Sequence, residues 1–263
     1  MKPPWPTGWR LEVLDRQTDP SAPLDQAAAE IFGLFAEREQ AFGVNPRVVI
    51  DIPDIADPAS SPFLTDPSGY LVRRVRALDA EAAPIVRVVV LTTYSQRLRA
   101  ALLAAGYTHT PIDMPAGPDG TGMFARTLPG QGGRTLYVEA VNEADEKIRP
   151  SFALRLWDGA GTLAGGACGS VHTHAGVRFA WLATLAVRAG LPAGTGTALA
   201  EAMMSHLRQR QVHTLYLGTQ TADAFYRQLG FATRLTVLPA LRHRQGAGGR
   251  RLTHDLVMME KRL

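Results

Sequence analysis

The clearest pattern along the chain is an apolar run followed by a glycine-rich turn and an amphipathic segment. The run Phe179–Val187 predicts a buried strand, and Gly190, Gly194 and Gly196 follow it. From Leu199 onward apolar residues recur every three or four positions, which predicts a helix. The N–H groups of a first helical turn lack partners within the helix, and the helix dipole favours negative charge beside them. The pattern therefore predicts an anion site at the start of this helix, and an ordinary strand-to-helix connection is the alternative.

Strand and helix patterns on both sides of this stretch place the chain in the α/β class. The first half begins with a strand at Trp9–Leu14 and a long helix at Leu24–Phe42. The second half continues from a hairpin at residues 152–172 to a strand at Thr214–Thr219 and a short helix within Ala222–Phe231. Both halves therefore mix strands with helices that are long enough to cover a sheet.

The two halves of the chain also share a weak internal repeat. The strand, helix and closing glycine of Val88–Tyr107 resemble those of Leu215–Phe231, and the segments align when Gly106 is placed on Gly230. Chance similarity between two strand–helix units remains the alternative explanation.

Composition and charge narrow the class of protein. At 263 residues with a formal net charge of +4, the chain is long enough for one or two domains and is mildly basic. The excess of basic residues lies late in the sequence, where it either forms a solvated face or attracts phosphates. The sequence has no basic–aromatic motif that would predict nucleic-acid binding. Cys168 is the only cysteine, which excludes a disulfide framework and a cysteine zinc site. Without a membrane-spanning apolar run or a signal peptide, we expect a cytoplasmic protein with no membrane partner.

The segment after the second strand carries a further motif, ADAFYRQLGF, at Ala222–Phe231. Together with the strand, GxG turn and helix before it, this motif resembles the GNAT superfamily of acyl-CoA-dependent N-acyltransferases, over about Thr135–Leu263. The resemblance implies an α/β fold with a mixed, mostly antiparallel sheet and flanking helices. It also implies that the glycine-rich turn holds the pyrophosphate of CoA and that Tyr226 protonates the leaving thiolate. The implied CoA-binding residues are Leu185, Ala186, Val187, Arg188, Ala193, Gly194, Thr195, Gly196 and Thr197.

The same resemblance bears on how the chain is divided. The glycine-rich segment Leu128–Arg134 is the best linker, so we predict two tandem lobes, at residues 1–130 and residues 134–263. The first lobe has no glycine-rich turn, and Leu102 stands where Tyr226 stands in the second. We therefore expect a degenerate GNAT-like first lobe without a CoA site, followed by the acyltransferase lobe.

Two departures from the family pattern concern the site. The family carries Arg or Gln where this chain has Leu191, and Arg188 is the candidate for replacing that cation. Many family members also carry a carboxylate on the strand before the turn, and this strand has none. His172 and His174, two residues apart on a strand end, are the candidate bases, and surface histidines near a turn are the structural alternative. The family further implies that a backbone N–H of Leu185–Val187 polarises the thioester carbonyl.

These observations predict an N-acetyltransferase that moves the acetyl group of acetyl-CoA to a primary amine of a small molecule or peptide by direct attack, without a metal. The acceptor stays open among antibiotics, amino acids, polyamines and protein lysines, and we expect a monomer or homodimer. One alternative is a degenerate relative that binds acyl-CoA as a sensor or scaffold. Another is a short-chain dehydrogenase that uses Gly190–Gly196 as a GxxxGxG fingerprint, but too few residues follow and the YxxxK pair is absent.

Overall fold

The strand nearest the N-terminus pairs with a strand from the second half of the chain. The computed structural model describes residues 5–41, 49–51, 62–66, 69–70, 73, 85–93, 96–112, 121–129, 134–141 and 150–263. In it β1 (Arg10–Asp15) lies antiparallel to β7 (Phe152–Trp157). Residues 1–46 and 149–263 form one compact unit, unit 1, and residues 47–148 form unit 2. Unit 2 is therefore inserted into unit 1.

This division differs from the predicted lobes at residues 1–130 and 134–263. The strand and helix predicted to open the front lobe belong to unit 1. The first strand within the predicted back lobe, β6 (Arg134–Val141), belongs to the sheet of unit 2. The physical reason is that β7 takes β1 as its outer neighbour, and the local sequence pattern of a strand does not encode which distant strand it will join.

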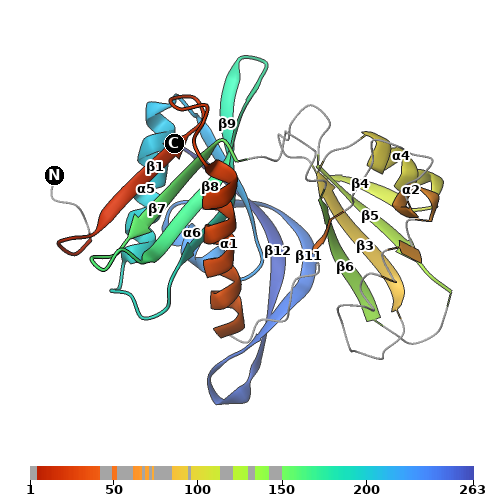
Figure 1. Cartoon of the computed structure of the whole chain (residues 1–263). Helices are drawn as coiled ribbons and strands as arrows, with labels where there is room; N and C mark the ends of the chain where they lie inside the picture. Colours follow the sequence, from red (N-terminus) through yellow and green to blue (C-terminus); the bar gives the residue numbers. More distant parts are fainter. Residues whose placement is uncertain are drawn as a thin grey trace. The chain divides into compact units, whose positions relative to one another are not determined.

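Unit 1 is built on a seven-stranded sheet in the order β1-β7-β8-β9-β10-β12-β11 (Figure 1). Only the pair β9–β10 is parallel, so the predicted mixed, mostly antiparallel sheet with flanking helices is confirmed. After β7 the elements of unit 1 are β8 (Leu163–His174), β9 (Val177–Val187), α5 (Thr195–Gln209), β10 (Thr214–Thr219), α6 (Asp223–Gln228), β11 (Ala232–Gln245), the 3-10 turn η2 (Ala247–Gly249) and β12 (Arg251–Arg262).

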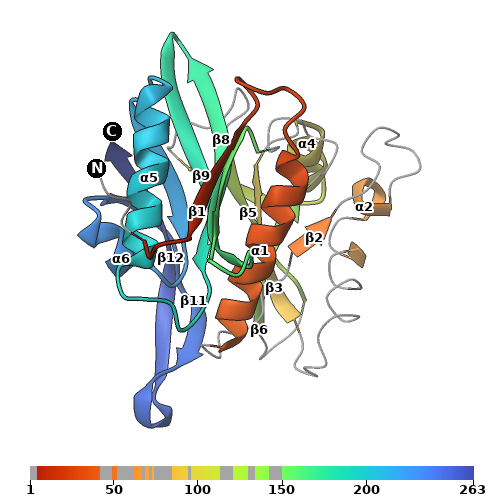
Figure 2. The same cartoon turned by 60° about the vertical axis from the view of Figure 1, so that its left-hand side comes forward.

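The sheet of unit 1 carries helices on both faces, with α1 (Leu24–Ala41) on one and α5 on the other (Figure 2). Alternate residues of β7 separate the two sides, as the period of a strand requires. Phe152 and Leu154 are buried in the core with α5, whereas Ala153 is buried against α1. We call these two sides the α5 face and the α1 face.

On the α1 face a buried arginine ties both N-terminal elements to β7. The Arg155 guanidinium donates to Glu12 on β1 at 2.9 Å and to Glu30 on α1 at 2.7 Å. The two carboxylates raise the pKa of Arg155 against the opposing effect of its burial. Because a buried charge without its partners is costly, these contacts specify how β1 and α1 join the sheet.

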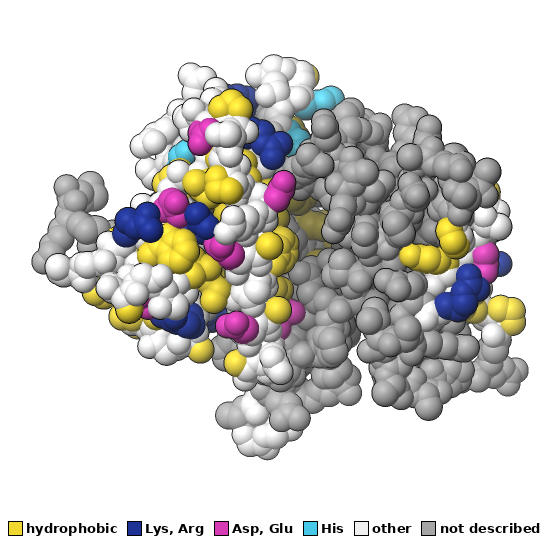
Figure 3. All heavy atoms as spheres, in the orientation of Figure 1, with side chains coloured by type: hydrophobic (Ala, Val, Ile, Leu, Met, Phe, Trp, Pro, Cys, Tyr) yellow, Lys and Arg dark blue, Asp and Glu magenta, His cyan; other side chains and the backbone are white. Residues whose placement is uncertain are grey.

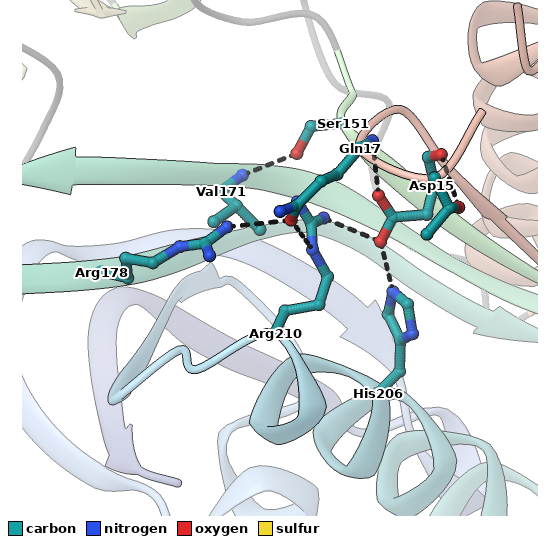
Figure 4. Close-up of polar contacts among 8 residues, drawn as sticks. Asp15, Gln17, Ser151, Val171, Arg178, His206 and Arg210 are labelled. Carbon is teal, nitrogen blue, oxygen red and sulfur yellow. Dashed lines mark hydrogen bonds and ion pairs between the residues drawn. The ribbon is translucent and has the colours of Figure 1, made fainter. Parts of the chain in front are cut away.

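A second polar cluster joins the end of β1 to the last turn of α5 (Figure 4). The Asp15 carboxylate is 2% exposed, and its Oδ2 lies 2.7 Å from His206 Nε2 and 2.8 Å from Arg210 Nη1. Gln17 Oε1 accepts hydrogen bonds from Arg178 on β9 and from Arg210. Three segments far apart in sequence therefore meet at the hairpin end of β9.

The middle of β9 contains a bulge at which it separates from β10. Thr184 lies opposite Cys168 and Leu182 lies opposite Gly169, so Ala183 is an extra residue on β9. The parallel pairing of β9 with β10 runs only to Leu182, although β9 continues to Val187. Within residues 150–263, all of which are described, the C-terminal end of β9 is therefore not paired to β10.

We expect Gly169→Ala to destabilise unit 1, because a Cβ at Gly169 would lie 2.0 Å from the Trp181 carbonyl oxygen at the bulge. Relieving this clash requires a backbone shift, and overpacking typically costs about 1–3 kcal/mol. Gly33→Ala is the matched control, since Gly33 lies in α1 with open space around a Cβ. It should stabilise by about 0.5–1 kcal/mol.

Tryptophan fluorescence during urea unfolding measures this difference in unit 1 alone. All four tryptophans belong to unit 1: Trp5, Trp9, Trp157 and Trp181. An unchanged midpoint for Gly169→Ala would contradict the close approach at the bulge.

Unit 2 contains a five-stranded sheet in the order β2-β6-β3-β5-β4. Besides β6, its described elements are β2 (Val49–Asp51), α2 (Pro62–Thr65), β3 (Ile85–Thr93), α4 (Gln96–Ala104), β4 (Thr108–Ile112) and β5 (Thr121–Thr127). β3 has a parallel neighbour, β6, on one side and an antiparallel neighbour, β5, on the other. β10 stands in the same way between β9 and β12.

In the two segments of the predicted repeat, the helices α4 and α6 end in the same way. Gly106 and Gly230 have φ angles of 81° and 82°, and the next residue in each case donates its N–H to the carbonyl five positions earlier. The acceptors are Leu102 and Tyr226, both of which are buried. A common origin of the two segments stays a prediction, as does the degenerate GNAT-like lobe.

Candidate functional site

The glycine-rich turn leads directly into α5, as the sequence predicts. Gly194 precedes the helix with φ of 86°, a left-handed conformation that favours glycine. The helical hydrogen bonds begin with Ala198 N–H donating to the Gly194 carbonyl. The amides of Gly196 and Thr197 therefore lie in the first turn, ahead of the helical ladder, where an anion is favoured. Ala193 lies within the same turn.

The hydroxyl of Thr195 does not cap the helix. Thr195 Oγ1 donates to the Pro192 carbonyl at 2.7 Å, and the residue is buried. This hydrogen bond holds the Thr195 side chain against the backbone of the turn. The backbone amides, rather than the Thr195 hydroxyl, are therefore the donors that the turn offers to a ligand.

The end of β9 presents backbone polar groups toward the side of β10. Arg188 N–H donates to the Ala164 carbonyl of β8. Backbone polar groups of successive residues in a strand point to alternate sides, so those of Ala186 also face β8. The N–H and C=O groups of Leu185 and Val187 therefore face the opposite side. That opposite side is where β9 has left β10. A ligand lying there meets an extended strand edge that leads toward the glycine-rich turn.

The structure places two arginines around this end of β9. Arg188 Nη2 lies 2.6 Å from Asp158 Oδ2 in the β7–β8 turn, so its guanidinium is engaged by a carboxylate. A hydrogen bond from the Thr162 amide and the contact with Arg188 both lower the pKa of Asp158. Arg38, from the last turn of α1, donates to the Val187 carbonyl at 3.0 Å. Arg38 was not among the predicted site residues, because no local sequence signal relates it to a strand 149 positions later.

Tyr226 lies on α6 with its ring in the core of unit 1, and it is 8% exposed. Its ring makes edge contacts with Phe225 and Phe231, at centroid distances of 5.1 Å and 5.5 Å. Burial raises the pKa of the Tyr226 phenol, so the hydroxyl stays protonated at physiological pH. The phenol therefore remains a hydrogen-bond donor under working conditions.

Of the two adjacent aromatic residues, Tyr226 lies in the core and Phe225 does not. Phe225 is partly exposed and packs at the border of the core, and a Cβ at Gly196 would lie 3.8 Å from its ring. The rotation of α6 about its axis decides which residue is buried. The start of α6 thus lies beside the glycine-rich turn.

The two candidate bases lie at the hairpin end of β8. His174 is exposed, whereas His172 is half-buried, stacks on Phe179 at 5.4 Å and has its Nε2 2.8 Å from Ser170 Oγ. Burial lowers the pKa of His172, which keeps its imidazole neutral at pH 7. From Phe179, opposite His172, the strand runs about 13 Å to the bulge at Ala183 and about 26 Å to its end. The histidines are thus not brought next to the glycine-rich turn.

The described part of the chain offers neither a metal-ligand cluster nor a membrane-spanning helix. No group of three or more His, Cys, Asp or Glu side chains in that part of the chain is arranged to hold a metal ion. None of the helices among the described residues has the length and apolar character needed to cross a membrane. On the face of unit 1 seen in Figure 3, acidic and basic side chains are interspersed among apolar ones.

Comparison with known proteins shows what this region is similar to. Residues 124–231 match the family model of the acetyltransferase (GNAT) family. The match begins in β5 of unit 2 and ends just after α6. It therefore includes the glycine-rich turn and Tyr226 but neither β1 nor α1.

Three solved acetyltransferases illustrate the similarity. The ribosomal-protein-S18-alanine N-acetyltransferase from Escherichia coli is 24% identical, with 42% of this chain and 67% of that chain covered and a TM-score of 0.32. The ribosomal-protein-alanine N-acetyltransferase from Brucella melitensis is 25% identical, with 42% and 68% covered and a TM-score of 0.32. The IAA acetyltransferase from Bacillus cereus is 16% identical, with 43% and 77% covered and a TM-score of 0.34. No curated protein sequence matches the chain.

Proposed function

We propose that the chain, whose residues 124–231 match the acetyltransferase (GNAT) family model, transfers the acetyl group of acetyl-CoA to a primary amine by direct attack. The observation that carries this proposal is the pairing of two backbone features. The open amides at the start of α5 stand next to the edge of β9 that has separated from β10. The amides at the start of α5 suit the binding of a pyrophosphate. The unpaired edge of β9 suits an extended ligand that ends in a thioester.

In this proposal the acyl donor is held mainly by backbone groups. The amides of Gly196 and Thr197 bind the pyrophosphate, and the turn of Ala193, Gly194 and Thr195 lets it approach closely. The N–H of Leu185 or Val187 donates to the thioester carbonyl and stabilises the oxyanion that forms on it. The side chain of Arg188 contributes through its contact with Asp158, which fixes the loop, rather than as a free cation.

The reaction balances with the donor, the acceptor and one proton transfer. The amine nitrogen attacks the carbonyl carbon, a C–N bond forms, and the C–S bond to CoA breaks with its electron pair on sulfur. The amine loses one proton, and Tyr226 gives one to the thiolate and is reprotonated from solvent. Because His172 and His174 stand away from the bulge, we propose that the amine proton leaves through water.

The dehydrogenase alternative does not suit the fold. A nucleotide fingerprint of that kind follows the first strand of a parallel sheet. Here the turn follows β9, whose one parallel neighbour is β10 in an otherwise antiparallel sheet. The non-catalytic sensor is the alternative that specific observations favour, since Tyr226 is buried and Arg188 is ion-paired.

We expect acetyl-CoA to raise the thermal stability of unit 1, because a ligand that binds only the folded state stabilises it by mass action. At a concentration one hundred times its dissociation constant, the stabilisation is about 2.7 kcal/mol. Tryptophan fluorescence during heating measures the midpoint, with NADPH at the same concentration as the control. A shift with NADPH and none with acetyl-CoA would contradict the acyltransferase assignment.

Release of free thiol from acetyl-CoA with a panel of primary amines separates the enzyme from the sensor. Stabilisation by acetyl-CoA together with amine-dependent thiol release supports the enzyme. Stabilisation without release from any amine would support the sensor.

A further inference from the structure

Four rings lie in a row on the α1 face of β8, β9 and β10, and we call this row the aromatic strip. His172 stacks on Phe179, Phe179 meets the edge of Tyr216 at 5.9 Å, and Tyr216 lies 5.5 Å from Trp181. The side of the sheet follows from strand alternation. Ala180 and Leu182 are buried in the core with α5, so Phe179 and Trp181 point the other way.

The strip ends where β9 and β10 separate. Trp181 and Tyr216 are opposite each other, one position before the last pair, Leu182 with Leu217. The turn proposed to hold the pyrophosphate opens α5, on the other face of the sheet. If a thioester enters the gap from that face, an acceptor reaches its carbonyl carbon from the α1 face, on which Trp181 lies. The aromatic strip therefore borders the side from which an acceptor must approach. This placement of the acceptor rests on the proposed function.

The rings differ in what they offer to a ligand. Phe179 and Tyr216 are buried, whereas Trp181 and His172 are partly exposed. The buried pair packs against the partly exposed pair and fixes the orientation of those rings. An aromatic group that meets a ring already held in place gains stacking without a large ordering cost.

The charges on this face argue against a polycationic acceptor. By strand alternation, Glu260 is the one carboxylate on the α1 face of β8, β9, β10 and β12 among the described side chains of these strands. Both of its oxygens accept from Arg234, at 3.2 Å and 3.3 Å. A site for an acceptor with several ammonium groups needs several carboxylates that are not already neutralised.

We propose that the acceptor is a small primary amine carrying an aromatic ring, an arylalkylamine, whose ring stacks on Trp181 while its nitrogen reaches the gap between β9 and β10. Tyr216 and Phe179 hold the strip in shape, and His172 extends it away from the reaction centre. Trp181 is a specificity-determining residue in this arrangement.

The test compares amines on the full-length protein at saturating acetyl-CoA, with free thiol release as the signal. The panel contains phenethylamine, tryptamine, cyclohexylethylamine as the matched non-aromatic amine, spermidine and kanamycin. We expect kcat/KM for the two aromatic amines to exceed kcat/KM for spermidine and kanamycin by at least about tenfold. The aromatic amines should exceed cyclohexylethylamine by a smaller factor, because the energy of a stacked pair is modest. Higher kcat/KM for spermidine or kanamycin would overturn the aromatic acceptor and leave the acetyltransferase intact.

Variants of the strip separate recognition from a general structural effect. Trp181→Ala should raise the KM for phenethylamine by about tenfold with kcat and the KM for acetyl-CoA nearly unchanged, and Trp181→Phe should restore much of the loss. Trp157→Phe on β7 is the matched control and should change none of these values. Equal KM values for phenethylamine in wild type and Trp181→Ala would overturn the role of Trp181.

A binding measurement keeps the inference testable if no amine is acetylated. In that case the proposed catalysis fails, and calorimetric titration of phenethylamine into the protein with CoA present decides the role of the strip. Binding that is lost in Trp181→Ala and kept in Trp157→Phe supports the strip as an aromatic site. No binding to the wild-type protein overturns it.

Discussion

Replacing Tyr226 by Phe should lower the turnover rate by about 10²–10⁴-fold, the usual contribution of general acid catalysis. The departing CoA thiolate would otherwise leave as an anion into a site that excludes water, because a free thiol has a pKa above neutral. Burial raises the pKa of Tyr226, so the phenol keeps its proton throughout the pH range in which enzymes are assayed. Stopped-flow or steady-state thiol release with a good amine measures the change.

The same substitution should leave folding and acetyl-CoA affinity nearly unchanged, because the ring and its contacts with Phe225 and Phe231 stay in place. Tyr107→Phe is the matched control, since Tyr107 is a second buried tyrosine and lies in unit 2. It should turn over at the wild-type rate. A wild-type rate for Tyr226→Phe would show that Tyr226 is a packing residue and that water or another group protonates the thiolate.

Gly196→Val should weaken acetyl-CoA binding by at least about tenfold, which corresponds to about 1.4 kcal/mol. A Cβ at Gly196 meets Phe225 and Val187 at 3.8 Å, an ordinary contact distance, so alanine fits there. The two γ-methyl groups of valine add bulk around the amides of the first turn. Gly196→Ala should therefore keep most of the affinity, and calorimetric titration of the two variants isolates the effect of the added methyl groups.

Stability must be measured on the same variants, because a misfolded turn would also lose the ligand. Valine has a higher helix propensity than glycine, so Gly196→Val should cost little folding free energy. Gly33→Val, in the exposed part of α1, makes the same exchange away from the site and should keep full affinity. Unchanged affinity in folded Gly196→Val would move the phosphate site elsewhere.

The local elements of unit 1 were predictable because their signals lie within a few residues. The helix predicted at Leu24–Phe42 is α1, Leu24–Ala41, and the first strand is displaced by one residue. Glycine at position 194 has the positive φ that a turn before a helix requires, and the apolar run forms β9. Periodicity and glycine conformation are properties of neighbouring residues, so the sequence alone is sufficient for them.

The side chains of the candidate site were less predictable than its backbone. The motif placed Tyr226 on a helix beside the turn, but whether Tyr226 or Phe225 enters the core depends on how α6 packs on the sheet. Arg188 was the expected cation, yet Asp158 of a neighbouring turn engages it, and Arg38 arrives from α1. Such partners are set by which elements become neighbours, information that no single segment contains.

The sequence by itself determined the class of fold, the glycine-rich turn with its helix, and the match of residues 124–231 to the acetyltransferase (GNAT) family model. Only the tertiary structure decided that β1 joins the sheet edge, that α1 covers one face of the sheet, and that residues 47–148 are inserted in the sequence between these elements and β7. The bulge at Ala183 that separates β9 from β10 was likewise a tertiary feature. The physical reason is that hydrophobic periodicity is encoded locally, whereas the choice of a strand's neighbour depends on side-chain packing between distant segments.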